Sequence, residues 1–238
     1  MRKVQTLIFI VLLILQLPPL YANLNYSQDF NSLKEIYCKN KEIPESYEKP
    51  ILLALSKYPE LNETKIKFKE KSLSTSINIK PKITFVLKEE PISITMAARP
   101  SGNFILKKKS KIQYNIIIND EYLWKENASE LNLGIQIGAL GHELGHIVDY
   151  LSMSKLQIFA FGLKYKFSEK FRSRIEKETD EEAINRGLGR ELYNFTFFIY
   201  NDKSASEEYL EYKRRIYYSP EEILALVEKY ENSSKISN

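Results

Sequence analysis

The chain has 238 residues, 43% of them hydrophobic. This is enough to bury one substantial hydrophobic core, but the chain is too short for two domains of ordinary size. The formal net charge is +4. Removal of the first 22 residues takes away only two charged residues, Arg2 and Lys3, so that 33 basic and 31 acidic residues remain and the net charge is +2. With so small a positive charge, no nucleic-acid partner is expected. The single cysteine excludes an internal disulfide, so the fold must rest on its core, with a metal ion as one further support.

The first 22 residues have the pattern of a secretory signal. Arg2 and Lys3 give a charged start, the run Leu7–Leu17 is apolar, and Ala22 offers a small residue for cleavage. We therefore predict a signal peptide at 1–22 and a secreted or periplasmic protein. If the segment stays uncleaved it would serve as an anchor, although it is shorter than the roughly 20 residues that a relaxed membrane span needs.

The next part of the chain predicts two helices and then a sheet. Residues 29–55 have helical spacing in two apolar groups, the second of which follows Pro50. Between 64 and 119, alternating β-branched and aromatic residues predict strands at 66–68, 77–79, 83–86, 92–94, 104–106 and 114–118. Turn residues at 100–103 and the basic run Lys107–Lys111 predict hairpin tips, and such charge runs are usually solvated.

From Ser129 onward the pattern is helical. Ser129 is placed to cap a helix that runs to about Leu151, and further helices are predicted near 155–170, 172–186, 189–200 and 220–230. The order of helices, then strands, then helices favours an α+β fold with a mainly antiparallel sheet in one domain, residues 23–238.

The helix predicted at 129–151 contains the segment His142-Glu143-Leu144-Gly145-His146. Histidines four residues apart share one face of a helix, so both imidazoles can bind one zinc ion. Glu143 cannot easily join them as a ligand, which leaves its carboxylate to take a proton from water and pass it to a leaving amine. Since the chain has only two histidines, chance would produce this pattern in roughly one chain of such composition in a thousand.

No histidine remains for a third ligand, so a carboxylate or another oxygen donor must supply it. The extended metzincin motif would need Gly at 149 and His or Asp at 152, but the chain has Asp149 and Ser152. A site with three histidines is therefore excluded.

A strongly helical acidic stretch, Ile175–Ala183, follows about thirty residues later, and Glu176 and Asp180 share one face of it. The pair of motifs resembles the gluzincin peptidases, in which His-Glu-x-x-His is joined by a downstream Glu-x-x-Ala-Asp, as in CAAX prenyl proteases and heat-shock-type membrane peptidases. Thr179 stands where alanine is usual, and the resemblance covers only residues 141–183, without the membrane spans of those families.

The resemblance implies a zincin-like domain with one zinc ion per chain. It assigns His142, His146 and Glu176 as zinc ligands, Glu143 as the general base and acid, and Asp180 as the acceptor that orients a ligand histidine. Other carboxylates remain alternatives. Those competing for the third ligand are Glu178, Glu181 and Glu182, and Asp149 could instead orient a histidine.

Glycines in the site helix, at 138, 141 and 145, predict a close approach by a neighbour, either the helix of Glu176 or the last strand of the sheet. In zincins generally, an edge strand receives an extended substrate, and Tyr114–Asn119 is the candidate by position, although its hydrophobicity also fits a core strand. Four residues could stabilise an oxyanion, and nothing in the sequence selects among Tyr193, Tyr212, Arg190 and Arg214.

The aromatic run Ile158–Tyr165 has two interpretations besides ordinary helix packing: a lid, or a contact with a membrane surface.

For the whole chain we predict an exported zinc endopeptidase that acts on a protein or peptide substrate. Two alternatives remain, namely an inactive binding protein stabilised by zinc, and a metal-dependent amidohydrolase acting on a non-protein amide of the cell wall.

Overall fold

The computed structural model of the chain describes residues 45–61, 65–70, 73–74, 82–88, 95–119, 130–203 and 205–236. The predicted signal peptide, the first predicted helix, and the strands predicted at 77–79 and 92–94 lie outside these residues. What is described is an α+β structure, as the sequence predicts.

The described strands form one sheet. They are β1 (Lys65–Glu70), β2 (Leu73–Ser74), β3 (Lys82–Lys88), β4 (Met96–Pro100) and β5 (Gln113–Asn119). Their order across the sheet is β2-β1-β3-β5-β4. β3 runs parallel to both β1 and β5, whereas β2 and β4 pair antiparallel with β1 and β5. The sheet is therefore mixed, and the prediction of a mainly antiparallel sheet is wrong.

The inner strands β3 and β5 contribute buried residues to the core. The run Ile116–Ile118 of β5 is buried throughout, and Ile83 and Phe85 of β3 are fully buried. An uninterrupted apolar run is typical of an inner strand covered on both faces, as in parallel sheets, whereas a half-solvated antiparallel strand alternates. Alternation elsewhere in the block gives no information on strand direction, which is why the sequence analysis missed it.

The edge strand β4 was not predicted, because Met-Ala-Ala-Arg-Pro has low strand propensity. It forms by pairing along its whole length with β5. The strand predicted at 104–106 is instead the 3-10 helix η2 (Phe104–Leu106), since Asn103 turns the chain with a left-handed φ of 62°. A second 3-10 helix, η3 (Lys109–Lys111), follows, so the turn chemistry predicted at 100–111 does form the β4–β5 connection.

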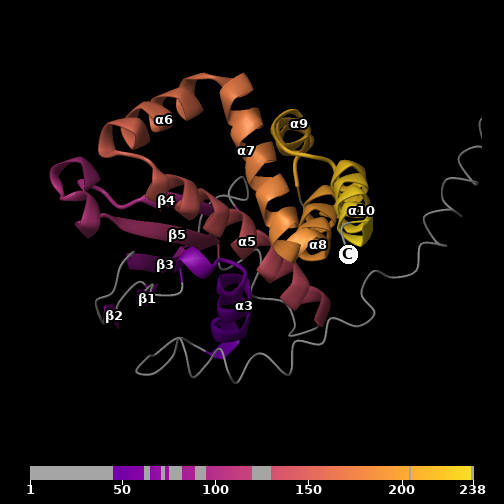
Figure 1. Cartoon of the computed structure of the whole chain (residues 1–238), viewed down its shortest axis with the longest axis horizontal. Coiled ribbons are helices and arrows are strands. Elements are labelled where there is room, and N and C mark those ends of the chain that lie inside the picture. The colour runs from indigo at the N-terminus through magenta and orange to yellow at the C-terminus, as the bar shows by residue number, and fades with distance from the viewer. Residues whose placement is uncertain are drawn as a thin grey trace, which may run out of the picture.

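Before the sheet lies α3 (Glu45–Ser56), followed by the 3-10 helix η1 (Pro59–Leu61). After the sheet come α5 (Glu130–Ser152), α6 (Lys155–Phe167), α7 (Glu169–Ala183), the π-helical turn η4 (Ile184–Leu188), α8 (Gly189–Asn201), α9 (Glu207–Ile216) and α10 (Pro220–Ile236). Figure 1 shows α7–α10 on one side, the strands on the other, and α5 between them. Among the described residues, no helix is both long and apolar enough to span a bilayer.

Two helices differ from the sequence prediction. α3 includes Pro50 instead of beginning after it. Its apolar run from Ile51 to Leu55 is buried against α5, and the free energy of this burial outweighs the helical hydrogen bond that Pro50 cannot donate. α9 was not predicted, since it is mostly charged and buries only Tyr209 and Ile216. The remaining predicted helices match within a few residues.

The glycines of α5 allow two neighbouring helices to approach it closely. A Cβ on Gly138 would lie 2.2 Å from the carbonyl oxygen of Glu191, in the backbone of α8, and one on Gly145 would lie 2.9 Å from Thr179 Cγ2 of α7. The close approach predicted from the sequence is therefore real. Its partners are α7 and, in addition, α8, which the sequence analysis had not considered.

Gly138→Ala is expected to destabilise the protein by about 2–3 kcal/mol, because the backbone of α8 would have to move, and this overpacking exceeds the gain of about 1 kcal/mol in helix propensity. The free energy of unfolding in urea would measure the effect. Gly162→Ala on α6 is the matched control, since a Cβ there meets nothing within 4 Å and should stabilise the protein slightly. Equal effects of the two substitutions would contradict the close contact.

Candidate metal centre

The middle of α5 carries three buried polar side chains. His142, Glu143 and His146 are each less than 10% exposed, although α5 is otherwise lined with apolar residues at this depth. One helical turn separates the two histidines, so their rings lie together, with centroids 4.9 Å apart. Buried polar groups are costly without partners, so the partners of these three residues define the site.

α7 supplies the facing carboxylates. Its buried face follows a helical spacing of three and four residues and consists of Ile175, Glu176, Thr179, Asp180 and Ala183. Oε2 of Glu176 lies 2.9 Å from Nε2 of His142 and 3.4 Å from Nε2 of His146. One carboxylate oxygen of Glu176 is therefore shared between both imidazoles.

The other ring nitrogen of each histidine is also held. Nδ1 of His142 donates to Oδ1 of Asp180 at 2.8 Å. The hydroxyl of Thr179 donates to the carbonyl of Ile175 at 2.9 Å, so its oxygen can accept from Nδ1 of His146 at 3.3 Å. Both imidazoles are thus oriented with Nε2 toward Glu176. Thr179, which stands where the gluzincin motif has alanine, has a contact that alanine could not make.

His142, His146 and Glu176 form a group that could hold a metal ion, and we call this group the cluster. Their ligand atoms all lie within 4.8 Å of one another. In a tetrahedral zinc site with bonds of about 2.1 Å, ligand atoms are about 3.4 Å apart, close to the observed separations of 2.9 and 3.4 Å. The donor set of two imidazoles and one carboxylate, with the outer nitrogens hydrogen-bonded, fits a transition metal.

The electrostatics of the cluster favour positive charge between these groups. Burial alone would lower the pKa of His142, but hydrogen bonds to Asp180 and Glu176 outweigh it and hold the pKa well above its usual value. Burial alone would raise the pKa of Glu176, yet the charge of His146 and hydrogen bonds from both histidines hold it well below its usual value. A bound cation would satisfy the same preference, with both histidines neutral.

Glu143 stands beside the cluster without joining it. Its Oε2 accepts a hydrogen bond of 2.5 Å from the backbone N–H of Ala98 in β4. Burial raises the pKa of Glu143, with the nearby charges of His142 and His146 acting in the opposite direction. A fixed carboxylate with a raised pKa is better suited to accept a proton near neutral pH than an ordinary surface glutamate.

Tyr165 of α6 reaches the second oxygen of the proposed ligand. Its hydroxyl donates to Oε1 of Glu176. Burial and the charge of Glu176 raise the pKa of Tyr165, so the phenol stays protonated and keeps donating. The sequence indicates only that Tyr165 belongs to the aromatic run Ile158–Tyr165, because its contact with Glu176 depends on how α6 folds back on α7.

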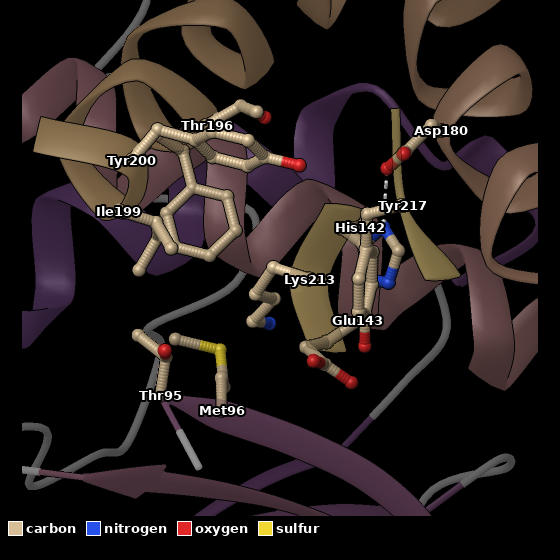
Figure 2. A pocket seen from close by; sticks show the side chains of 11 residues that line it. Thr95, Met96, His142, Glu143, Asp180, Thr196, Ile199, Tyr200, Lys213 and Tyr217 are labelled. Atoms are coloured by element: carbon tan, nitrogen blue, oxygen red, sulfur yellow. Dashed lines mark hydrogen bonds and ion pairs between the residues drawn. The ribbon is translucent and has the colours of Figure 1, made fainter. Parts of the chain in front are cut away.

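A pocket opens next to the cluster, as Figure 2 shows. The lining residues come from β4 and its start, α5, α7, α8, and α9 with the residue after it: Thr95, Met96, His142, Glu143, Asp180, Phe195, Thr196, Ile199, Tyr200, Lys213 and Tyr217. The ring of Tyr217 lies 6.0 Å from that of His142. The ammonium of Lys213 lies 4.1 Å from the centre of the Tyr217 ring, and no described carboxylate forms an ion pair with it.

The pocket lining includes Lys213 and Tyr217 but none of the four oxyanion candidates of the sequence analysis. Tyr193, Tyr212, Arg190 and Arg214 do not line the pocket, and both arginines form ion pairs with glutamates elsewhere. Lys213 was missed together with its helix. The signal that could have revealed α9 is its capping serine, followed by an acidic first turn and a basic last turn.

The competing carboxylates lie away from the cluster. Glu178 is 58% exposed beside Arg174, Glu181 accepts from Tyr218, and Glu182 pairs with Arg186. Asp149 is half-buried one turn beyond His146, but the described hydrogen bonds to the ring nitrogens come from Asp180 and Thr179 instead.

The strand that the sequence analysis names as an edge strand is an inner strand of the described sheet. Tyr114–Asn119 belongs to β5, which lies between β3 and β4 in the described sheet and is not an edge. β4 is the edge strand, because the chain turns back after β4 and β5 then pairs between β4 and β3.

Comparison of the chain with models of known families, with curated proteins and with solved structures gives no match. The chemistry of the site is therefore the basis for any conclusion about function.

Proposed function

We propose that the protein is a metal-dependent hydrolase. More narrowly, we propose an exported zinc endopeptidase. The observation that supports this most strongly is the convergence of His142, His146 and Glu176 in one buried group. The carboxylate of Glu143 lies beside this group, and Glu143 and His142 both line the adjoining pocket.

Zinc is the metal that we propose, with His142, His146 and Glu176 as its ligands. Two imidazoles and one carboxylate are one of the protein ligand sets of catalytic zinc sites, which leave one position for water or substrate. Magnesium and calcium prefer sites made of oxygen ligands alone. Zinc held here would supply Lewis acidity, polarising a substrate carbonyl and lowering the pKa of water.

Glu143 carries the proton transfers in this proposal. It takes a proton from the attacking water, whose oxygen forms the new bond to the carbonyl carbon, and delivers that proton to the amine nitrogen as the C–N bond breaks. The Ala98 N–H holds one carboxylate oxygen in place throughout. Lys213 and Tyr217 are the pocket residues that we assign to stabilise the negative charge that develops on the carbonyl oxygen.

The proposed substrate is an extended peptide lying alongside β4. Such a peptide can donate to the outward-facing carbonyl groups of β4, while the outward N–H of Ala98 stays bound to Glu143, and β4 contacts α5 next to the site. Because Ala98 of β4 is bonded to Glu143, a peptide in this position would bring its backbone close to the proton-transferring carboxylate.

The proposal can be tested with the purified full chain. Elemental analysis should find about one zinc per chain, and a library of fluorescence-quenched peptides should reveal cleavage that a chelator removes and zinc restores. Peptidoglycan fragments serve as comparison substrates for the amidohydrolase alternative. Stoichiometric zinc without cleavage of any peptide would contradict a peptidase, and failure to bind zinc would contradict the metal site itself.

A further inference from the structure

One end of the molecule exposes an unusual set of apolar side chains. Of the eight large hydrophobic residues that are well exposed among those described, six belong to η2 and α6. Leu106 is 86% exposed, Leu156 79% and Phe167 76%. We call this set the apolar patch; it consists of Ile105, Leu106, Leu156, Phe159, Leu163 and Phe167.

The patch lies on two elements that contact each other. Its four residues on α6 follow one another at intervals of three and four, so they form a row along one face of the helix. η2 contacts the start of α6, where Nζ of Lys155 donates to the carbonyl of Ile105 at 2.8 Å. Figure 1 shows α6 and the β4–β5 connection at the same end of the structure. Since α6 has 13 residues, the row is about 20 Å long.

The opposite face of α6 fixes the helix to the protein, so the exposed row is not a result of a loose helix. Ile158 and Phe161 are buried, and the Phe161 ring packs edge-to-face on Tyr150 of α5 with centroids 5.6 Å apart. Ser154 and Gln157 form a complete capping box at the start of the helix. α6 therefore presents the patch rigidly to its surroundings.

Exposed lysines lie on the elements that carry the patch and next to them in the chain. Six exposed ones lie on η2–η3, α6 and the first turn of α7: Lys108, Lys109, Lys111, Lys164, Lys166 and Lys170. No described carboxylate forms an ion pair with any of them, and Glu169, the exposed acidic residue beside them on α7, pairs with Arg215. The surface thus combines apolar side chains with unpaired positive charge.

We propose that this surface binds the face of a lipid bilayer that contains anionic lipids. Apolar side chains with a basic surround are the features of an element that lies in the bilayer interface, with the side chains among the acyl chains and the lysines at the headgroups. A second copy of this chain fits less well, because its own patch would bring like charges together. This inference does not depend on the proposed hydrolase activity.

Sedimentation with vesicles tests the proposal. The full chain should bind vesicles that contain about one third phosphatidylglycerol more strongly than vesicles of phosphatidylcholine alone, and added salt should weaken the binding. The double variant Leu106→Ser/Phe167→Ser should bind at least about tenfold less. Phe197→Ser, at an exposed aromatic residue of α8 outside the patch, is the matched control and should bind like the original chain.

A site-specific measurement separates the patch from any other part of the chain that attracts lipid. In Phe167→Trp, brominated acyl chains should quench the new tryptophan, whereas they should not quench it in Phe197→Trp; Trp124 contributes the same background to both. Equal quenching of the two tryptophan variants would overturn the proposal, and so would equal vesicle binding by the double serine variant and Phe197→Ser. The proposal would also be overturned if the double variant lost a dimer while its vesicle binding stayed unchanged.

Discussion

Glu143→Gln is expected to lower kcat/KM for peptide hydrolysis by about 10²- to 10⁴-fold while zinc stays bound. Glutamine has nearly the same shape, and its carbonyl oxygen can still accept from the N–H of Ala98, so the geometry is retained. It cannot accept a proton from water. Cleavage of the best peptide substrate and elemental analysis of the same sample would measure the two properties together.

The matched control is Glu178→Gln, which makes the same chemical change on the exposed face of α7 and should leave kcat/KM unchanged. If Glu143→Gln kept its activity within about threefold of the original chain, Glu143 could not be the proton carrier. A loss of zinc in this variant would instead assign Glu143 to metal binding.

Glu176→Ala is expected to weaken zinc binding by more than about 100-fold, because loss of a partner outside the ligand set alone costs about 10–100-fold. Removing this buried carboxylate also leaves two imidazoles without their common acceptor. Competition with a chromophoric zinc chelator would give the affinity. Glu178→Ala on the same helix should bind zinc with unchanged affinity, and equal losses in both would show that Glu176 is not a ligand.

Because Glu176 is almost fully buried, its removal could also affect folding. Glu176→Gln retains the volume and the hydrogen-bonding oxygen but lacks the charge, so it should unfold at nearly the same urea concentration as the original chain while still binding zinc weakly. Tight zinc binding by this folded variant would contradict the assignment.

The sequence predicted the two helices that carry the site more accurately than the sheet. A period of three to four residues, together with capping serines and glycines, defines helices such as α7 from local information alone. The same periodicity places His142 beside His146, and Glu176 on the face of Asp180. What it does not contain is the distance between the two helices, which depends on how Gly145 lets Thr179 approach.

The errors arose where pairing between distant segments determines structure. β4 has little strand propensity of its own and exists because β5 pairs with it, and the parallel centre of the sheet depends on a chain path that local alternation does not encode. The contribution of Tyr165 and Lys213 to the site likewise depends on the packing of α6 and α9. Residues supplied by such contacts cannot be found from spacing alone.

The hydrogen bond from Ala98 to Glu143 also affects how the β4 edge of the sheet can pair with other strands. A bare sheet edge invites strands of other molecules to pair with it and grow into aggregates. In β4 the N–H of Ala98 points away from β5 and is already engaged by Glu143, and two residues further on Pro100 has no N–H to offer. A foreign strand therefore finds no continuous row of donors along this edge. The carboxylate that we propose for proton transfer thus also limits pairing along this edge to the carbonyl groups of β4.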